Sequence, residues 1–479
     1  MLPSRREALK QIGAGLGAAA LPGCGFAPTL AEECAESPES RQTPDLAPGR
    51  DPAAHDLLSS IDTIVVVMME NRSFDHLLGS LRLDASYPSR AAIDGLTGDE
   101  WNMDVDGRPI QVSRMPGRGD GSIVPLHGWA EVRQTWNGGM NDGFVRVNAG
   151  RGQAEVMSYL VRDQLPFQYA LADNFTVCDR WFSSFMGQTW PNRFYLHAAT
   201  SGGRRENKPL WLNAPPTIWE RMALKCRSVK QYAAGPILWT TVAFPGMALS
   251  GNAPFEIGGV EDFFREARTG NLPELSVIDP DFKVSDGYPM RDVRLGDAFL
   301  SSVYRAMAES PQWSRSLLIV CYDEHGGYYD HVPPPQTADA RADFRQLGFR
   351  VPAFVIGPTV WSGKVVSTQF EHASVAATLA TRFGIESLGP RMDASADMAT
   401  CIDPARVGTP CAAPRLPAVE LPASCAATVG AATTSQGEME QALNQGDVPA
   451  AFVDPRSTEE RFAGWLRAAQ ELEAVKLVG

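Results

Sequence analysis

Three largely apolar runs constrain the fold of this chain more than any other feature of its sequence. They occupy residues 61–69, 316–322 and 351–356. Apolar and β-branched residues without polar alternation are typical of strands buried on both faces of a parallel sheet. Helical patterns lie between the runs, for example over 297–307 and 373–383. This alternation predicts an α/β fold with a mostly parallel central sheet flanked by helices.

Composition divides the 479 residues into further segments. Residues 25–58 are rich in Pro, Glu, Ala and Ser, and we predict that they form a flexible tether after an N-terminal signal at 1–24. The main folded domain should then cover 59–400. Within it, residues 204–270 carry scattered Gly, Pro and Trp, and they form either an insertion that shapes a ligand pocket or a plain surface excursion. Residues 401–479 are predicted to be a loop-rich extension that ends in a helix.

The last part of the chain carries a clear helix signal. Ser457 and Glu460 have the spacing of a capping box, in which each side chain satisfies a backbone N–H at the start of the helix. One face of that helix is apolar and consists of Phe462, Trp465, Leu466, Ala469 and Leu472. We expect this face to dock on the domain, with a membrane-surface role as the alternative.

The eight cysteines match no zinc site, because no two of them are closely spaced. Cys178 and Cys321 lie in apolar segments and are predicted to be buried thiols. Cys401, Cys411 and Cys425 fall in the extension, where we expect one disulfide if the protein resides in an oxidising compartment.

The N-terminus predicts export. Ser4 to Lys10 contains the pair Arg5-Arg6 and reads as a twin-arginine signal, which implies the twin-arginine translocation machinery as a partner. The apolar stretch that follows, about ten residues long, is too short to span a bilayer. Cys24 ends an imperfect lipobox, and it is either a lipidated membrane tether or a bystander. The protein is therefore expected to be exported, as a periplasmic, outer-membrane-anchored or secreted protein.

The overall charge restricts the class of partner. The formal net charge is −13, which argues against nonspecific nucleic-acid binding. An acidic protein that acts on an anionic substrate must build a locally positive site. Metal ions, helix N-termini and arginines are the usual means.

Polar clusters directly follow two of the apolar runs. Glu70-Asn71 comes after the first run, and Asp323-Glu324-His325 comes after the second. In open α/β sheets, ligands bind at the carboxyl ends of the strands. Burying this many ionisable groups without a metal or an anion to pair them would be costly. Oxygen and imidazole ligands together suit a divalent cation, whereas a helix N-cap at Asn71 with solvated charges is the structural alternative.

A third segment, residues 187–193, supplies a hydroxyl. Pro191 follows Thr189 by two residues, which places the threonine near the N-terminus of a helix. Backbone N–H groups at such a position can hold a phosphate. A free threonine hydroxyl is a poor nucleophile and needs a metal to activate it. The alternative is an ordinary capping threonine.

Together these segments resemble the bacterial phosphoesterase family that contains non-haemolytic phospholipases C and an acid phosphatase, within the alkaline phosphatase superfamily. The resemblance runs from about residue 61 to 385, in the family's order. It is carried by the motifs MMENRSFDHLLG, HGWAEVRQTWNGGMNDGF, DNFTVCDRWFSSFMGQTWPNRFY, CYDEHGGYYDHVPPP and EHASVAATLATRFG. It implies an alkaline-phosphatase-like fold.

The resemblance also implies roles for individual residues. The metal ligands would be Glu70, Asn71, Thr189, Asp323 and Glu324, with Thr189 as the nucleophile. The metal would be divalent, with Ca, Mg, Mn and Zn all open. Further catalytic residues would be His127, His372 and His325, and the phosphate would be bound by Asn192 and Arg193.

Two positions depart from the family pattern. The family carries Glu/Asp-His-Pro near residue 286, whereas this chain reads Ser-Asp-Gly-Tyr-Pro over 285–289. We predict that Tyr288 protonates or hydrogen-bonds the leaving oxygen in place of the missing histidine, with Asp286 as the alternative. Glu371 stands where an Asp is commoner.

The sequence therefore predicts an exported, metal-dependent phosphoester hydrolase of the phospholipase C type that works through a phospho-threonine. One alternative is an acid phosphatase that acts on small phosphomonoesters. The other is a catalytically silent exported binding protein.

Overall fold

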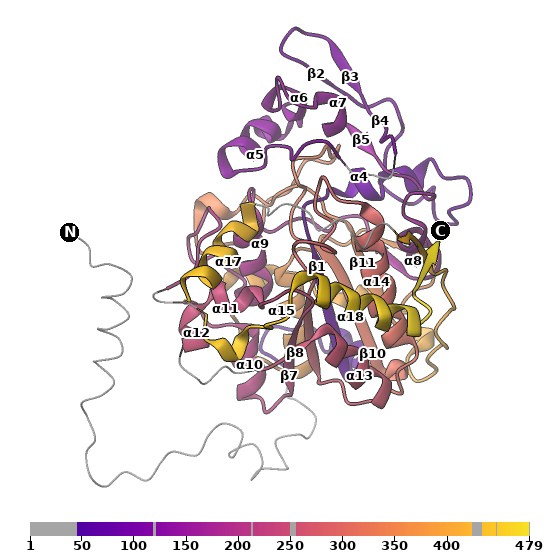
Figure 1. Cartoon of the computed structure of the whole chain (residues 1–479), viewed down its shortest axis with the longest axis vertical. Helices are drawn as coiled ribbons and strands as arrows, with labels where there is room; N and C mark the ends of the chain where they lie inside the picture. Colours follow the sequence, from indigo (N-terminus) through magenta and orange to yellow (C-terminus); the bar gives the residue numbers. More distant parts are fainter. Residues whose placement is uncertain are drawn as a thin grey trace, which may run out of the picture. The chain divides into compact units, whose positions relative to one another are not determined.

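The computed structural model describes residues 46–117, 121–211, 214–249, 255–423, 434–446 and 448–478. Its centre is an eight-stranded sheet with the strand order β12-β6-β11-β10-β1-β9-β7-β8 (Figure 1). The strands are β1 (Thr63–Met69), β6 (Thr176–Cys178), β7 (Val229–Ala233), β8 (Glu256–Gly259), β9 (Leu275–Asp279), β10 (Ser316–Tyr322), β11 (Ala353–Ile356) and β12 (Val365–Val366). Two-stranded sheets are formed by β2 (Trp101–Met103) with β3 (Pro109–Gln111), β4 (Ser113–Arg114) with β5 (Ser158–Tyr159), and β13 (Val419–Pro422) with β14 (Val475–Val478).

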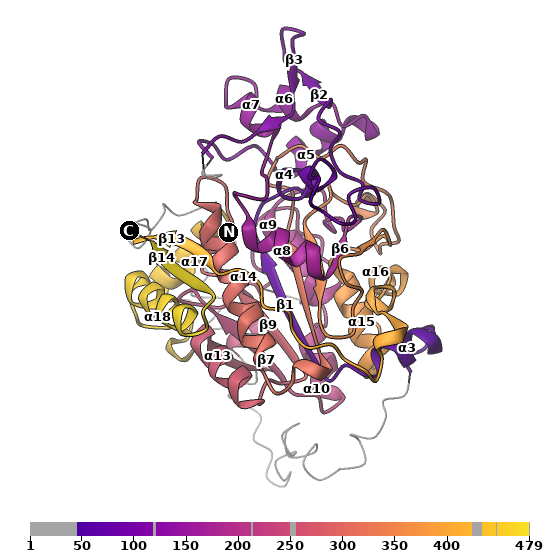
Figure 2. The ribbon, with the colours of Figure 1, turned by 90° about the vertical axis from the view of Figure 1, so that its right-hand side faces the viewer.

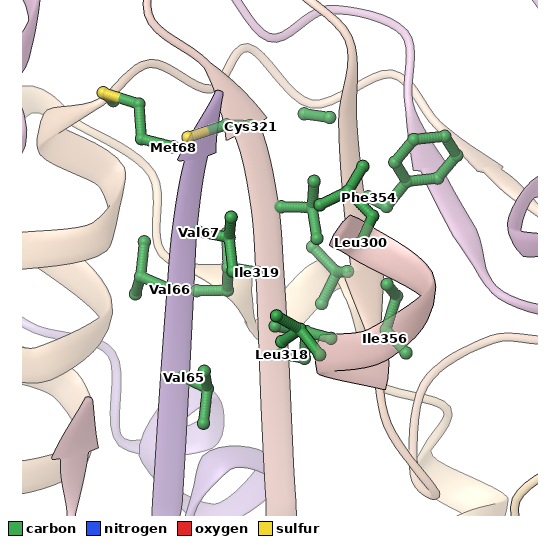
Figure 3. Packing of buried hydrophobic residues seen from close by; sticks show 14 of the residues in the cluster. Val65, Val66, Val67, Met68, Leu300, Leu318, Ile319, Cys321, Phe354 and Ile356 are labelled. Carbon is green, nitrogen blue, oxygen red and sulfur yellow. The ribbon is translucent and has the colours of Figure 1, made fainter. Parts of the chain in front are cut away.

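Strands β1 and β10 form the middle of the sheet. They pair in parallel from Thr63 opposite Ser316 to Met69 opposite Tyr322, and every residue of both strands is buried. Figure 3 shows Val66 of β1 and Ile319 of β10 among the apolar side chains of this core. Side chains on both faces of these strands are covered, which explains why the two sequence runs are apolar without alternation.

Helices form two packed groups, one on each face of the sheet (Figures 1 and 2). One group comprises α8 (Pro166–Asn174), α13 (Val260–Thr269), α14 (Val293–Ala308) and α18 (Thr458–Glu471). The other comprises α3 (Pro52–Leu58), α9 (Thr189–Ala198), α10 (Ile218–Leu224) and α15 (Ala373–Phe383). The predicted fold class, a mostly parallel sheet between helices, is confirmed.

One strand runs against the others. β11 pairs antiparallel with both β10 and β6, although its apolar run was expected in a parallel sheet. The connection from β10 to β11 contains no α-helix, only the short 3-10 turn η5 (Ala342–Phe344). A parallel strand would need a crossover back to the opposite edge of the sheet. Without such a crossover, the chain enters β11 at the same end of the sheet at which it left β10. β11 therefore runs antiparallel to β10.

A smaller group of elements, called the cap (residues 74–159), lies beyond the carboxyl end of β1 (Figure 2). It contains β2 to β5 and the helices α4 (Phe74–Leu77), α5 (Trp129–Trp136), α6 (Phe144–Val147) and α7 (Gln153–Val156). The buried Arg350 guanidinium ties the cap to the domain, because it bonds Asp75 at 3.0 Å, Asp330 at 2.9 Å and the Asp94 carbonyl at 2.7 Å.

Two predicted segments are more ordered than expected. The predicted tether over 25–58 ends in α3, which Asp51 caps through a 2.9 Å bond from the N–H of Ala53 and which buries Leu58. The predicted insertion over 204–270 contains β7 and β8, so it contributes two strands to the main sheet. Both strands are short and carry polar or glycine residues. A search for apolar runs in the sequence therefore does not find them. The predicted signal over 1–24 and residues 25–45 lie outside the described residues.

The C-terminal helix signal corresponds to α18. Its capping box between Ser457 and Glu460 is formed, and Trp465 is buried with its indole N–H donating to Ser302 of α14 at 3.1 Å. The apolar face therefore packs on the domain. Within the described ranges, no helix is long and apolar enough to cross a membrane.

The described cysteines include no disulfide between Cys401 and Cys411. Cys178 and Cys321 are buried free thiols, as expected. Cys401 and Cys411 are free as well, and Cys401 is buried with its sulfur 3.9 Å from that of Cys178. Among the described cysteines, Cys226 is disulfide-bonded, which the sequence had not indicated. Cys425, the third cysteine of the extension, lies outside the described residues.

Candidate active site

The turn after β1 is held against the turn after β10. Asn71 adopts a left-handed backbone with φ of 60°, a conformation that asparagine tolerates better than most residues. Its N–H donates to Asp323 Oδ1 at 2.8 Å. Because Met69 pairs with Tyr322, the polar residues that follow the two strands emerge side by side at one edge of the sheet.

The turn after β10 depends on two glycines. Asp323 Oδ1 also accepts the N–H of Glu324 at 2.7 Å, and Glu324 Oε2 accepts the N–H of Gly326 at 2.7 Å. Gly326 and Gly327 have φ of +64° and +77°. A Cβ on Gly326 would lie 2.0 Å from the carbonyl oxygen of Asn71, so no larger residue fits where the two turns meet.

Three carboxylates gather at this edge under almost complete burial. Glu70, Asp323 and Glu324 are at most 1% exposed. Burial, followed by the charge of Asp323, raises the pKa of Glu70 well above its ordinary value. Burial, followed by the charge of Glu324, raises the pKa of Asp323 to about 7. Asp323 Oδ2 and Glu324 Oε1 are buried with no hydrogen-bond donor among the described residues.

Unpartnered, buried carboxylate oxygens of this kind fit a cation, which would supply the missing interaction. Within the described ranges, no three His, Cys, Asp or Glu side chains by themselves form a metal-binding group. The predicted ligand set therefore depends on the amide oxygen of Asn71 and the hydroxyl of Thr189 in addition to the carboxylates. Both of these are oxygen donors suited to a hard divalent cation.

Thr189 lies next to Asn71. It is the first residue of α9, after Gln188 in extended conformation, and its hydroxyl donates to Asn71 Oδ1 at 3.2 Å. The neighbouring N–H of Trp190 donates to Asn207 Oδ1 at 2.9 Å. The structure thus brings the predicted nucleophile to the two turns, at a helix N-terminus as the sequence indicated.

His127 reaches the site from the cap. Its Nδ1 lies 2.7 Å from the Pro125 carbonyl, which requires a proton on that nitrogen. Nε2 is then the accepting nitrogen, and it lies 3.4 Å from Asn71 Nδ2 and 3.7 Å from Glu324 Oε1. Its side chain, 10% exposed, connects the site to the surface.

His325 borders the site but is deeply buried. Its Nδ1 lies 3.3 Å from Glu324 Oε2, and its ring packs against Phe349 at a centroid distance of 4.8 Å. Burial lowers its pKa. It is positioned to orient the Glu324 carboxylate.

His372 does not occupy the position expected of a phosphate-contacting or leaving-group histidine. Its Nδ1 accepts the Trp181 indole N–H at 3.3 Å, and its Nε2 lies 2.6 Å from the Asp323 carbonyl oxygen. These two contacts fix the neutral Nε2–H tautomer, and burial lowers its pKa to about 3. Both nitrogens are engaged by the protein, so His372 acts as a positioning residue for the Asp323 backbone.

Asn192 and Arg193 were also predicted to bind the phosphate, but both side chains are engaged within the protein. Asn192 exchanges hydrogen bonds with the backbone of Phe185 at 2.8 and 3.1 Å and so holds the loop before α9. The fully buried Arg193 guanidinium bonds the Met68 carbonyl at 3.0 Å and lies 3.7 Å from Glu70 Oε1. It lies 3.4 Å from Asp279 as well, and it therefore balances the carboxylates from within the protein.

Tyr288 lies on a loop beside Glu70. It is 4% exposed, and its N–H donates to Asp286 Oδ1 at 3.1 Å, while the Asp286 carbonyl accepts the N–H of Glu70 at 2.8 Å. Tyr288 is therefore turned away from solvent, and this burial is a condition of its predicted role. Glu371 is bound to Arg391 at 2.9 Å, which makes it a structural carboxylate.

The model of the Phosphoesterase family matches residues 61–386. The chain belongs to this family. It is similar to non-specific phospholipase C1 of Arabidopsis thaliana, at 35% identity over 379 residues that cover 70% of this chain and 69% of that protein. It is also similar to phospholipase C A of Mycobacterium tuberculosis, at 30% identity over 446 residues that cover 80% and 81%.

This phosphoesterase is accordingly a hydrolase of phosphoric esters. Among solved structures, a protein of the alkaline phosphatase superfamily from Vibrio parahaemolyticus aligns with a TM-score of 0.35 and 12% identity. That alignment covers 72% of this chain and 77% of the other and adds nothing to the family assignment.

Two arginines around the site, Arg72 and Arg291, escaped the sequence analysis. Arg72 donates to the carbonyls of Gly287 at 2.7 Å and Tyr288 at 3.1 Å, and Arg291 lies 2.8 Å from Asp286. Arg72 lies inside the motif after β1, so its position there was the available signal. Nothing in the local sequence distinguishes Arg291 from a surface arginine.

The close approach of the two turns predicts an unusually costly glycine substitution. Gly326→Ala should lower the free energy of unfolding by at least about 3 kcal/mol, because strain at positive φ adds to a backbone clash. Gly408→Ala is the matched control, since Gly408 has φ of +80° with nothing within 4 Å. It should cost about 1 kcal/mol. Equal losses in urea unfolding would contradict the proposed contact between the turns.

Proposed function

We propose that this phosphoesterase is a metal-dependent hydrolase of the phospholipase C type, with Thr189 as its nucleophile. The observation that carries the proposal is the 3.2 Å hydrogen bond from the Thr189 hydroxyl to Asn71, whose own N–H is bound to Asp323. These two bonds connect the only hydroxyl of the predicted ligand set to the turn after β10, which carries Asp323 and Glu324. The names of the relatives support a phospholipase C activity.

The oxygen atoms that would hold the metal come from the predicted ligand set, namely Glu70, Asn71, Thr189, Asp323 and Glu324. The unpartnered oxygens of Asp323 and Glu324 support this assignment. A bound divalent cation supplies positive charge that keeps the carboxylates ionised and lowers the pKa of the threonine hydroxyl. Ca, Mg, Mn and Zn all accept oxygen ligands of this kind.

In the first step, the Thr189 hydroxyl loses its proton to solvent water, Oγ1 attacks the phosphorus, and the bond to the leaving oxygen breaks. This forms a phospho-threonine. The positive end of the α9 helix dipole stabilises charge on the phosphoryl oxygens. Tyr288, buried on the adjoining loop, is the proposed donor to the leaving oxygen.

In the second step, water attacks the phosphorus and the Oγ1–P bond breaks. His127 Nε2 accepts a proton from this water, because its Nδ1–H is bound to the Pro125 carbonyl and leaves Nε2 as the basic nitrogen. The released Thr189 oxygen regains a proton. His325 and His372 hold Glu324 and the Asp323 backbone in place through both steps.

A second candidate is an acid phosphatase that acts on small phosphomonoesters. The same nucleophile and metal would serve it, and the distinction depends on which substrate substituents the pocket accepts. A catalytically silent binding protein is disfavoured, because Thr189, Asn71 and Asp323 are joined by hydrogen bonds and the chain keeps every residue type of the predicted ligand set.

We further propose that the protein is exported through the twin-arginine translocation machinery and resides in the periplasm, on the outer membrane or outside the cell. A lipid on Cys24 would tether it to the membrane. The support is the Arg5-Arg6 signal followed by a short apolar stretch.

Removal of the nucleophile should abolish turnover. Thr189→Ala should lower kcat by at least about a thousandfold, because the attacking oxygen is lost. Thr189→Ser keeps the hydroxyl and should retain measurable activity. The assay is nitrophenolate release from p-nitrophenyl phosphate and p-nitrophenylphosphorylcholine. Activity of the alanine variant within tenfold of wild type would rule out Thr189 as nucleophile.

Removal of the metal should abolish turnover reversibly. A chelator should inactivate the enzyme, and one of the four cations should restore it. Asp323→Asn keeps the acceptor for the Asn71 N–H but loses the charge, so cation-dependent thermal stabilisation should disappear. Asp106→Asn, with its side chain 63% exposed, is the control and should keep it. Full activity of a metal-free preparation would contradict the proposal.

Cation affinity should also depend on pH. The pKa of Asp323 is raised to about 7 in the cation-free protein, so protons compete with the metal below that value. Affinity should weaken progressively as the pH falls from about 7 and should level off above it. Calorimetric titration at several pH values tests this, and an affinity that is constant between pH 5 and 8 (about the range in which such a group titrates) would contradict it.

Export depends on the arginine pair. Replacing both, with Arg5→Lys and Arg6→Lys, should retain the precursor in the cytoplasm, because this pathway recognises arginine. Cell fractionation with immunoblotting measures the outcome. Normal export of the double variant would show that another route is used.

A further inference from the structure

Asp286 and Arg291 form a buried ion pair that is only half satisfied. Arg291 Nη1 lies 2.8 Å from Asp286 Oδ1, and the two side chains are 7% and 0% exposed. Arg291 Nη2 and Asp286 Oδ2 are buried with no hydrogen-bond partner among the described residues. The pair therefore presents one unused donor and one unused acceptor.

Leaving both groups unsatisfied is costly. An unpaired buried donor or acceptor costs about 1–3 kcal/mol, and more when it is charged. An arginine and a carboxylate avoid this cost by pairing through two parallel hydrogen bonds. Here the end-on contact instead leaves the second nitrogen and the second oxygen unused. The pair therefore offers one donor and one acceptor to a ligand.

The surrounding loop holds the pair in this geometry. Asp286 Oδ1 also accepts the N–H of Tyr288 at 3.1 Å, which fixes the carboxylate. Arg72 holds the carbonyls of Gly287 and Tyr288, and Met290 turns the chain with φ of 69°, a strained value for a residue other than glycine. The loop therefore holds the ion pair in the end-on geometry.

The loop adjoins the candidate active site. The Asp286 carbonyl accepts the N–H of Glu70 at 2.8 Å, and a Cβ on Gly287 would lie 3.8 Å from the Glu70 carbonyl oxygen. A substrate held at Thr189 would thus have its substituents near this loop. The stretch is also the one in which the expected histidine is absent.

The chemistry of the pair selects the kind of ligand. A hydroxyl group can accept from Arg291 Nη2 and donate to Asp286 Oδ2 at the same time. A second anionic group would satisfy Arg291 alone and would be repelled by Asp286. A quaternary ammonium group has no N–H to donate and would leave the arginine unsatisfied.

We propose that Asp286 and Arg291 form a subsite for a hydroxyl group on a substituent of the phosphoester, so that the enzyme prefers polyol esters such as those of glycerol. This inference rests on the proposed function and specifies its substrate class. Arg291 and Asp286 are thus specificity-determining residues, since they contact the substrate away from the reacting bond.

The test compares two diesters of p-nitrophenyl phosphate, one with glycerol and one with propanol. They share the carbon skeleton and the leaving group and differ in the two hydroxyls. The wild-type kcat/KM should favour the glycerol diester by at least about tenfold, the worth of one charge-assisted hydrogen bond. Arg291→Met should bring this ratio close to one. Asp286→Asn, which keeps the acceptor for Arg291 Nη1, should lower it as well.

Arg294→Met is the matched control. Arg294 lies three residues further along and is paired with Asp292 at the start of α14, so its loss should leave the ratio unchanged. A wild-type ratio near one, or a ratio that both subsite variants leave intact, would overturn the inference and assign the free donor and acceptor to bridging water.

A binding measurement separates this inference from the proposed function. Glycerol 1-phosphate should bind the wild-type protein at least about tenfold more tightly than propyl phosphate in calorimetry, and Arg291→Met should remove the difference. Equal affinities would overturn the subsite. Absence of nitrophenolate release from every ester would instead contradict the proposed hydrolysis, while the affinities would still decide the subsite.

Discussion

The hydrogen bond from the Asn71 N–H to Asp323 Oδ1 is the contact on which the rest of the site depends. It joins the turns that follow the two central strands, and it requires a left-handed Asn71 and a glycine at 326. The parallel register of β1 and β10 brings the turns to the same edge. Thr189 then joins the cluster through the Asn71 side chain. One backbone contact thereby sets the relative position of Thr189 and the carboxylates.

Electrostatics explains why such a cluster needs a counter-charge. Three nearly fully buried carboxylates repel one another, and burial already raises the pKa values of Glu70 and Asp323. Arg193 offsets part of this charge from inside the protein, where it also bonds the Met68 carbonyl. The unused oxygens of Asp323 and Glu324 remain, and a divalent cation is the group that would satisfy them. An anionic substrate can then approach a protein whose net charge is −13.

Much of the fold could be predicted from the sequence, because β1 and β10 are covered on both faces and therefore read as continuous apolar runs. The short strands β7 and β8 carry polar and glycine residues, and no local pattern marks them. The direction of β11 depends on the absence of a crossover helix, which an apolar run cannot reveal.

The site could be predicted in part for a similar reason. Residues that directly follow paired strands must converge, so Glu70, Asn71, Asp323 and Glu324 could be grouped. Thr189 was grouped with them through its motif. The roles of His372, Asn192 and Arg193 depend on which way each side chain points. Sequence proximity to Thr189 or to a motif does not determine this direction, and all three proved to be engaged by the protein itself.

The central claim is that Thr189 is placed to take up the phosphoryl group of the substrate. Its most direct test is rapid acid quenching of the wild-type enzyme during turnover of p-nitrophenyl phosphate, followed by peptide mass spectrometry. The account predicts a transient phosphoryl group on the peptide that contains Thr189, localised to that residue by fragmentation and absent from Thr189→Ala. Turnover with no modification of this peptide, or a phosphoryl group on another residue, would contradict the account.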